Sequence, residues 1–360
     1  MTARYSFFET ACRKDPESPY IRQHYARMLS REGRDDLGLG QIDEGLRMNS
    51  SLRVLHHTRG VILSHLTTTI ESPEVARRRL VQAEEAFRRC LSFYHRDDYA
   101  YQGLAELYLN WAKRAREPSE SAEYISKAEG VISEGLRLVR VRDGLWIVSS
   151  KIRDWLGDQP SCFRALEQAV KSTPGSIIAR YLLGRAYRRA RSPEKAGMVL
   201  EPLVKDHPDE FRACVEYAMA LLELGEPYSK AIAALRLSTT YGLTDPRFVA
   251  TLGGLLFMNE EFTEAKRVFD ESIKQEFPAD EASRIQFRPR QRGDPKARVR
   301  LRGKVVAVKT GYAFVQPPEF PAFLCPGSMY GGVSVSEGIN IGFEPAFSAR
   351  GALAEHPTLA

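Results

Sequence analysis

A repeat of about 34 residues constrains the fold of this chain more than any other feature of its sequence. A small residue recurs at a nearly fixed step, and a large apolar residue follows each one four positions later: Cys162 and Leu166, Ala196 and Leu200, Ala231 and Leu235, and Ala265 and Phe269. A period of this length indicates a solenoid of stacked helix pairs. We therefore predict a mainly α fold, with about seven helix-turn-helix units over residues 1–278.

A second set of positions repeats on the other helix predicted for each unit. It consists of a large residue followed by a small one: Leu183 and Gly184, Tyr217 and Ala218, and Leu252 and Gly253. Pro174 and Pro208 end two of the units. Together these residues resemble the tetratricopeptide repeat, most strongly between residues 143 and 277. The resemblance implies that the small residues lie where the two helices of a unit cross, and that the large ones fill the space between units.

The repeat is fainter in the first part of the chain. One unit begins at Pro19, with Tyr25, Ala26, Leu29, Gly38 and Ile42 at the matching positions. Residues 53–140 resemble two further units that are stretched by insertions. We expect the first and last units to act as caps.

Arrays of this type bind partners along a groove formed by the first helix of each unit. Three arginines in the middle of the array favour an anionic protein partner, and apolar residues in the last two units favour an apolar one. The groove residues predicted are Arg185, Arg188, Arg189, Val215, Met219, Leu222, Ala250 and Phe257. Two alternatives stay open: the arginines belong to a solvated face, or the apolar stripe packs against a later segment of the same chain.

After Phe277 the helical pattern stops and the charge changes. Between Arg284 and Lys309 there are ten basic residues and one acid, whereas the whole chain carries a net charge of +6. We interpret residues 279–297 as a basic linker rich in Pro and Gly, although Ile285 and Phe287 could pin part of it. Local basicity on an otherwise nearly neutral chain favours a polyanionic partner.

Residues 298–360 read as short β-strands separated by Gly, Pro and Ser. Five segments follow one another in the order expected of a small barrel: Gly303-Lys304-Val305, Gly311-Tyr312-Ala313-Phe314-Val315, Ala322-Phe323-Leu324-Cys325, Glu337 to Phe343, and Arg350-Gly351-Ala352-Leu353-Ala354. In order and spacing these segments resemble the cold-shock type of oligonucleotide-binding (OB) fold. The resemblance implies an all-β barrel that stacks the bases of single-stranded RNA or DNA on exposed aromatic rings.

The residues that would bind nucleic acid are three aromatic rings and a basic row. The resemblance implies that Tyr312, Phe314 and Phe323 share one face, and the basic row would neutralise phosphates. That row consists of Arg298, Arg300, Arg302, Lys304 and Lys309. The family's exposed Trp corresponds to Ala307 here, and its strand His to Cys325. The alternative is that the rings belong to the barrel core and the basic row protects an exposed edge strand.

Enzyme signatures are missing from the sequence. It contains no phosphate-binding loop, no dinucleotide fingerprint and no nucleophile elbow. His57 and His65 could share a helix face, but no second pair at metal spacing accompanies them. We therefore expect no catalytic residue, no metal and no cofactor.

Composition excludes several other classes. No apolar run approaches the roughly 18 residues of a membrane helix, and the five scattered cysteines form no disulfide framework. We expect a cytoplasmic protein with no membrane partner. The leading hypothesis is a non-enzymatic adaptor whose helical array binds a protein and whose barrel binds single-stranded nucleic acid, with RNA favoured over DNA. The alternative is a purely protein-binding scaffold or regulatory subunit, for example of a bacterial stress or phage-defence complex, whose barrel is a docking module.

Overall fold

A computed structural model describes residues 2–275, 277–291, 294–330 and 332–359, with the side chains of residues 2–5 and 294–296 left out. The chain forms two compact units, Met1–Ala179 and Arg180–Ala360, and the boundary falls inside helix α10. The domain limits at residues 278 and 297 stay a prediction. Each unit is described by itself below.

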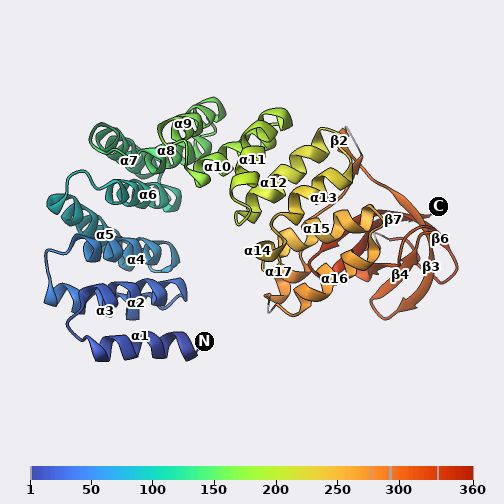
Figure 1. Ribbon diagram of the computed structural model, residues 1–360, viewed down its shortest axis with the longest axis horizontal. Coiled ribbons are helices and arrows are strands. Elements are labelled where there is room, and N and C mark those ends of the chain that lie inside the picture. Colours follow the sequence, from blue (N-terminus) through green and yellow to red (C-terminus); the bar gives the residue numbers. More distant parts are fainter. Residues whose placement is uncertain (1, 276, 292–293, 331, 360) are drawn as a thin grey trace. The chain divides into compact units, whose positions relative to one another are not determined.

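Unit 1 consists of α-helices that pack as antiparallel pairs, each beside the next (Figure 1). After α1 the pairs are α2–α3, α4–α5, α6–α7 and α8–α9. Their bounds are α1 Thr2–Lys14, α2 Pro19–Arg31, α3 Asp35–Met48, α4 Arg53–Thr69, α5 Pro73–Phe93, α6 Asp98–Arg114, α7 Pro118–Leu138, α8 Asp143–Trp155 and α9 Gln159–Ser172. Several begin with a capping side chain, as Asp97 accepts a 3.0 Å hydrogen bond from the amide of Ala100.

The two pairs predicted to contain insertions contain longer helices instead. Helices α4 and α6 have 17 residues each, against 13 in α2 and α8. Helices α5 and α7 have 21 each, against 14 in α3 and α9. The added residues therefore extend both helices of a pair, and the buried residues of α5 keep a three-and-four spacing: Ala76, Leu80, Ala83, Phe87 and Cys90.

Unit 2 has three more helix pairs among its described residues. They are α10–α11, α12–α13 and α15–α16, followed by the short α17. The bounds are α10 Ile177–Arg189, α11 Pro193–Asp206, α12 Phe211–Glu223, α13 Tyr228–Arg236, α14 Thr239–Gly242, α15 Pro246–Met258, α16 Phe262–Ile273 and α17 Ala279–Ser283. The described part of the chain thus has the predicted seven pairs and forms a tetratricopeptide-like solenoid.

The repeated small residues mark close helix contacts, as the sequence predicts. A Cβ atom on Gly184 would come within 2.4 Å of the Leu200 side chain, and one on Gly253 within 2.5 Å of the Phe269 ring. Each contact joins the first helix of a pair to the second. The repeated positions Cys162, Leu166, Ala196, Leu200, Ala231, Leu235, Ala265 and Phe269 are all buried.

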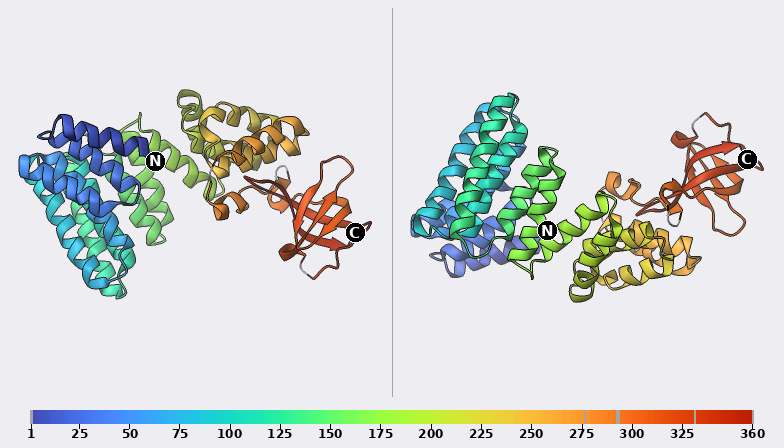
Figure 2. Two further views of the ribbon diagram at one scale, coloured as in Figure 1. Left: turned by 90° about the horizontal axis from the view of Figure 1, so that it is seen from below. Right: turned by 90° about the horizontal axis from the view of Figure 1, so that it is seen from above.

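The carboxy-terminal strands close into a five-stranded barrel in the order β3-β4-β5-β7-β6, with β6 pairing back to β3 (Figure 2). Neighbouring strands are antiparallel except β5 and β7, which are parallel. The bounds are β3 Leu301–Lys309, β4 Tyr312–Gln316, β5 Phe323–Pro326, β6 Asn340–Ser348 and β7 Gly351–Leu359. Val305, Val315, Phe323 and Phe343 fill its core.

One end of this barrel packs on the last helix pair. Phe257, near the end of α15, lies against the rings of Phe320, Phe323 and Phe347, with centroid distances of 5.9, 5.1 and 5.6 Å. On α16, the hydroxyl of Ser272 donates a buried 2.6 Å hydrogen bond to the carbonyl of Ala349. The cover of this end is therefore α15, which also contacts β6 and β7. Between β5 and β6 the described residues include no α-helix.

The segment before the barrel is pinned at several points. Phe287 is buried and pairs with Phe347 of β6 through backbone hydrogen bonds. Arg288 forms an ion pair with the buried Glu355 of β7, with a nitrogen–oxygen distance of 2.6 Å. Two short strands, β1 Arg290–Gln291 and β2 Asp294–Arg298, then pair with each other ahead of β3.

Candidate functional site

The outer face of strand β4 carries two aromatic rings, of which Tyr312 is exposed and Phe314 is half-buried. Along β4 the side chains of Ala313 and Val315 point into the barrel, so Tyr312 and Phe314 point outward. Tyr312 is 38% exposed, and the two rings meet edge to face with centroids 5.6 Å apart. Lys309 of β3 is the cross-strand partner of Tyr312 and therefore shares its face. Tyr312 and Phe314 thus share one face of their strand, as the sequence predicts.

Phe323 does not join this face, which corrects the prediction of a three-ring platform. It is fully buried and lies inside the barrel between Phe257 and Phe343. The reason is the register of β5, in which Phe323 is paired with the inward-pointing Val315. Leu324 is paired with Phe314 and takes the outward position instead.

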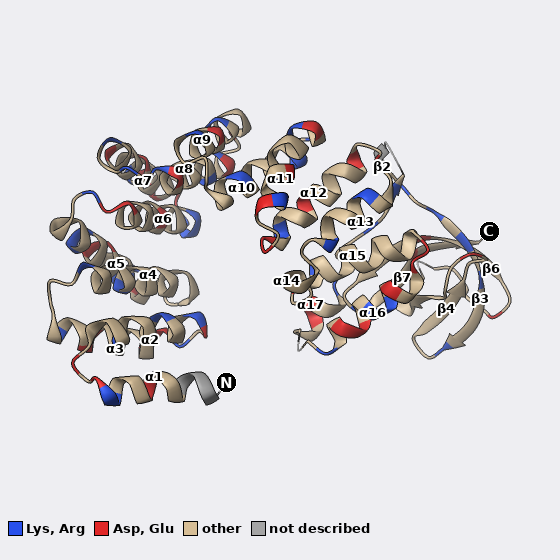
Figure 3. Ribbon diagram, viewed as in Figure 1, with Lys and Arg blue, Asp and Glu red and all other residues tan. Residues whose placement is uncertain are grey.

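The predicted basic row does not lie on one continuous strand. Arg298 ends β2, and β3 begins only at Leu301. Arg298 forms a 2.6 Å ion pair with Glu344, and Arg300 lies 3.8 Å from the same carboxylate. The exposed row on the barrel itself is Arg302, Lys304 and Lys309. Figure 3 shows the charged residues along the chain.

One of the predicted groove arginines, Arg188, is bound to a buried carboxylate, and a second, Arg185, lies near it. Glu216 of α12 is fully buried and lies 2.5 Å from Arg188, 3.0 Å from Arg247 of α15 and 4.0 Å from Arg185. Burial alone would raise the pKa of Glu216, but Arg188 and Arg247 hold it below its ordinary value. The glutamate therefore ties α10, α12 and α15 together, and Arg188, which is also paired with Glu223, is not free for an anionic partner.

The apolar half of the predicted groove is largely buried within the chain. Val215 is buried, and so is Ala250. Phe257 is covered by the barrel, which corrects its assignment to a partner groove and supports the alternative of packing against a later segment. The physical reason is that α15 is apolar on every side, with all residues from Phe248 to Phe257 buried.

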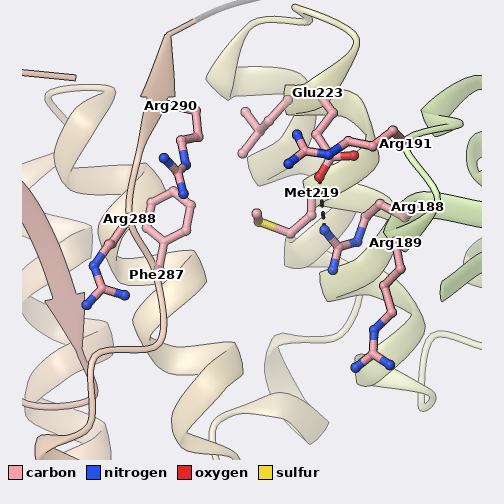
Figure 4. Close-up of a pocket in the computed structure, with 9 residues that line it drawn as sticks. Arg188, Arg189, Arg191, Met219, Glu223, Phe287, Arg288 and Arg290 are labelled. Carbon is pink, nitrogen blue, oxygen red and sulfur yellow. Dashed lines mark hydrogen bonds and ion pairs between the residues drawn. The ribbon is translucent and has the colours of Figure 1, made fainter. Parts of the chain in front are cut away.

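The remaining groove residues line a pocket of about 250 Å³ (Figure 4). Arg188, Arg189, Met219 and Leu222 form one side of it. The other side comes from Phe287, Arg288 and Arg290, which sequence reasoning assigned to a linker. Their basicity was visible in the sequence, and Phe287 was a possible anchor there, but the sequence did not identify α10 and α12 as the helices that this segment meets.

Unit 1 has a second, larger pocket of about 510 Å³ on the first helices of its pairs. Gln23 and Arg27 of α2 line it, together with His57 of α4 and Tyr99 at the start of α6. Burial lowers the pKa of His57. No group of three His, Cys, Asp or Glu side chains could hold a metal ion anywhere in the described ranges. None of the helices described combines the length and apolarity needed to cross a membrane.

No protein-family model matches this chain. The chain is 30% identical over 148 residues to a cellulose synthase operon protein C of Xanthomonas axonopodis pv. citri (strain 306), which is 41% of this chain and 10% of that protein. This chain therefore aligns with about a tenth of that relative's length.

Among solved structures, a thermophilic TPR protein of Thermus thermophilus aligns with 57% of this chain and 100% of its own, at 18% identity and a TM-score of 0.46. The PilF protein of Pseudomonas aeruginosa aligns with 69% of this chain and 96% of its own, at 11% identity and a TM-score of 0.40.

Proposed function

We propose that this protein is a non-enzymatic adaptor whose helical array binds a protein segment and whose barrel binds single-stranded nucleic acid. The observation that carries the second half is the outward pair Tyr312 and Phe314, flanked by Lys309 and, further along β3, Lys304. Exposed rings beside lysines are the combination that binds an unpaired strand with little sequence preference. Each stacked base contributes roughly 1–3 kcal/mol, and the lysines neutralise its phosphates.

The topology of the barrel supports this proposal. A closed sheet with antiparallel neighbours and a single parallel pairing, between its third and last strands, is the strand arrangement expected for an OB-type barrel. The face formed by β3 and β4 is the outer face of its first two strands. With Phe323 buried, the platform has two rings, and we expect binding to be correspondingly weaker than on three.

The alternative, a docking module, uses a different part of the barrel. Phe323 and Phe347 lie at the end that packs on α15, whereas Tyr312 and Phe314 face away from the barrel core. Docking on the helices therefore does not cover the two outward rings. The two roles are compatible within one chain.

The protein-binding half of the proposal rests on the pocket of unit 1. Arg27 and Tyr99 line it beside apolar side chains, and Arg53 at its rim is already paired with Asp97. A pocket of 510 Å³ on the first helices of the pairs is large enough to take several side chains of a bound segment. Its mixed lining favours a segment that has both apolar and acidic residues.

Fluorescence anisotropy with a labelled, unstructured RNA and its DNA counterpart tests the nucleic-acid half. We expect the double variant Tyr312→Ala, Phe314→Ala to lose roughly tenfold or more in affinity. Leu359→Ala removes an exposed apolar side chain from β7 and is the matched control. Replacing Lys304 and Lys309 by Ala should reduce the slope of log affinity against log salt by about 1.4. Binding that is unchanged in the folded double variant would refute the stacking face.

Co-purification after nuclease treatment tests the protein half. We expect Arg27→Glu to abolish capture of a partner that the natural sequence retains. Arg267→Glu makes the same charge change on an exposed side chain of α16 and should have no effect. Equal capture by both variants would place the partner elsewhere than in the unit 1 pocket.

A further inference from the structure

The pocket of unit 2 is lined mainly by arginines that come from two distant segments. Arg188, Arg189 and Arg191 stand at the end of α10 and in the turn after it, and Arg288 and Arg290 stand opposite them in the segment before the barrel (Figure 4). One acid, Glu223, is among the residues that line the pocket. Five arginines therefore line a space of about 250 Å³, and the guanidinium group of Arg189 points away from those of Arg191 and Arg290 (Figure 4).

The charges of two of these arginines are already balanced. Arg188 lies 2.5 Å from Glu216 and 2.9 Å from Glu223, and Arg288 is paired with Glu355. Arg189, Arg191 and Arg290 form no ion pair with any residue the structure describes. The pocket thus has three arginines that no ion pair with a described residue neutralises.

Arg290 shows the effect of this excess. Its side chain is half-buried, and burial, followed by the neighbouring Arg298, Arg288 and Arg191, lowers its pKa. Mutual repulsion among these guanidinium groups costs free energy that a bound anion would recover. The floor of the pocket is apolar, because Met219, Leu222 and the buried Phe287 complete it.

We propose that this pocket binds a phosphomonoester, with its phosphate between Arg191 and Arg290 and its organic part against Phe287, Met219 and Leu222 (Figure 4). A dianionic phosphate balances the two guanidinium charges of Arg191 and Arg290 better than a single carboxylate does. The planar fork of arginine also matches phosphate oxygens in pairs. Pockets for drug-sized ligands begin at roughly 300 Å³, so this smaller one holds a single phosphorylated group. This inference does not depend on the barrel or on the partner of unit 1.

Calorimetric titration of the full chain with phenyl phosphate tests the proposal. We expect saturable binding that weakens roughly tenfold to hundredfold in Arg290→Ala. Arg300→Ala, an arginine outside the pocket, should bind like the natural sequence. Arg191→Ala removes an exposed side chain and should also weaken binding, so the test stands even if Arg290→Ala fails to fold. No binding of phenyl phosphate up to millimolar concentration, or an equal loss in Arg300→Ala, would overturn the proposal.

Two further arms identify the chemistry of the ligand. Because the second pKa of a phosphate ester is about 6, binding should be tighter at pH 8 than at pH 5, whereas arginine stays charged throughout. Phenylacetate carries one charge at both pH values and should bind more weakly than phenyl phosphate. Inorganic phosphate should bind, but less tightly, because it lacks the apolar part. Equal affinities for phenylacetate and phenyl phosphate would show that the pocket does not select phosphate, which contradicts the proposal.

Discussion

Replacing Phe257 by Ala should loosen the barrel, although Phe257 belongs to a helix of the array. Its side chain is only 7% exposed and contacts three rings of the barrel end. Transfer of such a side chain out of water contributes about 1.5–3 kcal/mol. The cavity left between α15 and the barrel adds to this, so the total loss should be about 3–5 kcal/mol. If the contact did not form in solution, the loss would be about 0.5 kcal/mol.

Hydrogen exchange measures this loss where it should occur. A decrease of about 3–5 kcal/mol in the free energy of opening accelerates amide exchange by two to three powers of ten or more. We expect that acceleration in peptides from β6 and β7. The three tryptophans, Trp111, Trp146 and Trp155, all lie in unit 1. The midpoint of denaturation followed by tryptophan fluorescence, which reports on unit 1, should therefore be unchanged in Phe257→Ala. This gives an internal control for the same variant.

A matched variant separates the contact from a general effect of losing a ring. Phe314→Ala removes a phenyl group from the outer face of the same barrel and should cost about 1 kcal/mol at most. If exchange in β6 and β7 rises no more in Phe257→Ala than in Phe314→Ala, then α15 does not stabilise the barrel and the reasoning fails.

Three other predictions concern stability and reactivity. Gly254→Ala should also accelerate amide exchange in the barrel, because its Cβ would lie 2.6 Å from the Phe287 side chain. Gly130→Ala is the opposite case: its Cβ meets no neighbour within 4 Å, so the variant should stabilise unit 1 by about 0.5–1 kcal/mol in denaturation followed by fluorescence. Glu216→Gln should destabilise unit 2 by about 3 kcal/mol, the lower end of the range for a broken buried pair, because Arg247 is 38% exposed. Since the folded pKa of Glu216 is lowered, its contribution is complete above about pH 4.5 and is lost as the pH falls further, so acid-dependent exchange in unit 2 should be flatter in the variant. Burial raises the pKa of the Cys325 thiol to about 11, so a thiol reagent at pH 8 should leave it unmodified until the protein unfolds, and rapid labelling of native Cys325 would contradict this.

The helical array could be predicted from the sequence because its signal is local and repeated. The positions that recur from unit to unit are the ones that the close helix contacts require, as Gly184 against Leu200 and Gly253 against Phe269 demonstrate. The long helices of residues 53–138 were harder to predict. The extra residues of these units are consistent with either a loop or longer helices, and only the regular spacing of Ala76, Leu80 and Ala83 favours the helix.

The positions of the aromatic rings in the barrel could be predicted only in part. Tyr312 and Phe314 are two residues apart, so they had to share a face. Phe323 stands in a strand of four residues, where alternation cannot distinguish inside from outside; its pairing with Val315 decides the matter. The pocket of arginines could not be predicted from the sequence, because Arg188 and Arg290 are far apart in the chain and only folding brings them to one pocket.

The lengths of the helices in unit 1 have a consequence for how such a chain can change during evolution. The long pairs differ from the short ones by four residues in the first helix and seven in the second. At about 3.6 residues per turn these are close to one and two whole turns, so the buried stripe returns to nearly the same side of each helix. Any other small number of inserted residues would rotate part of the stripe by about 100° per residue into solvent. Insertions in these helices should therefore be tolerated in whole turns and rejected otherwise. Helix pairs of different length can then follow one another in one array without a change in the pattern of buried residues.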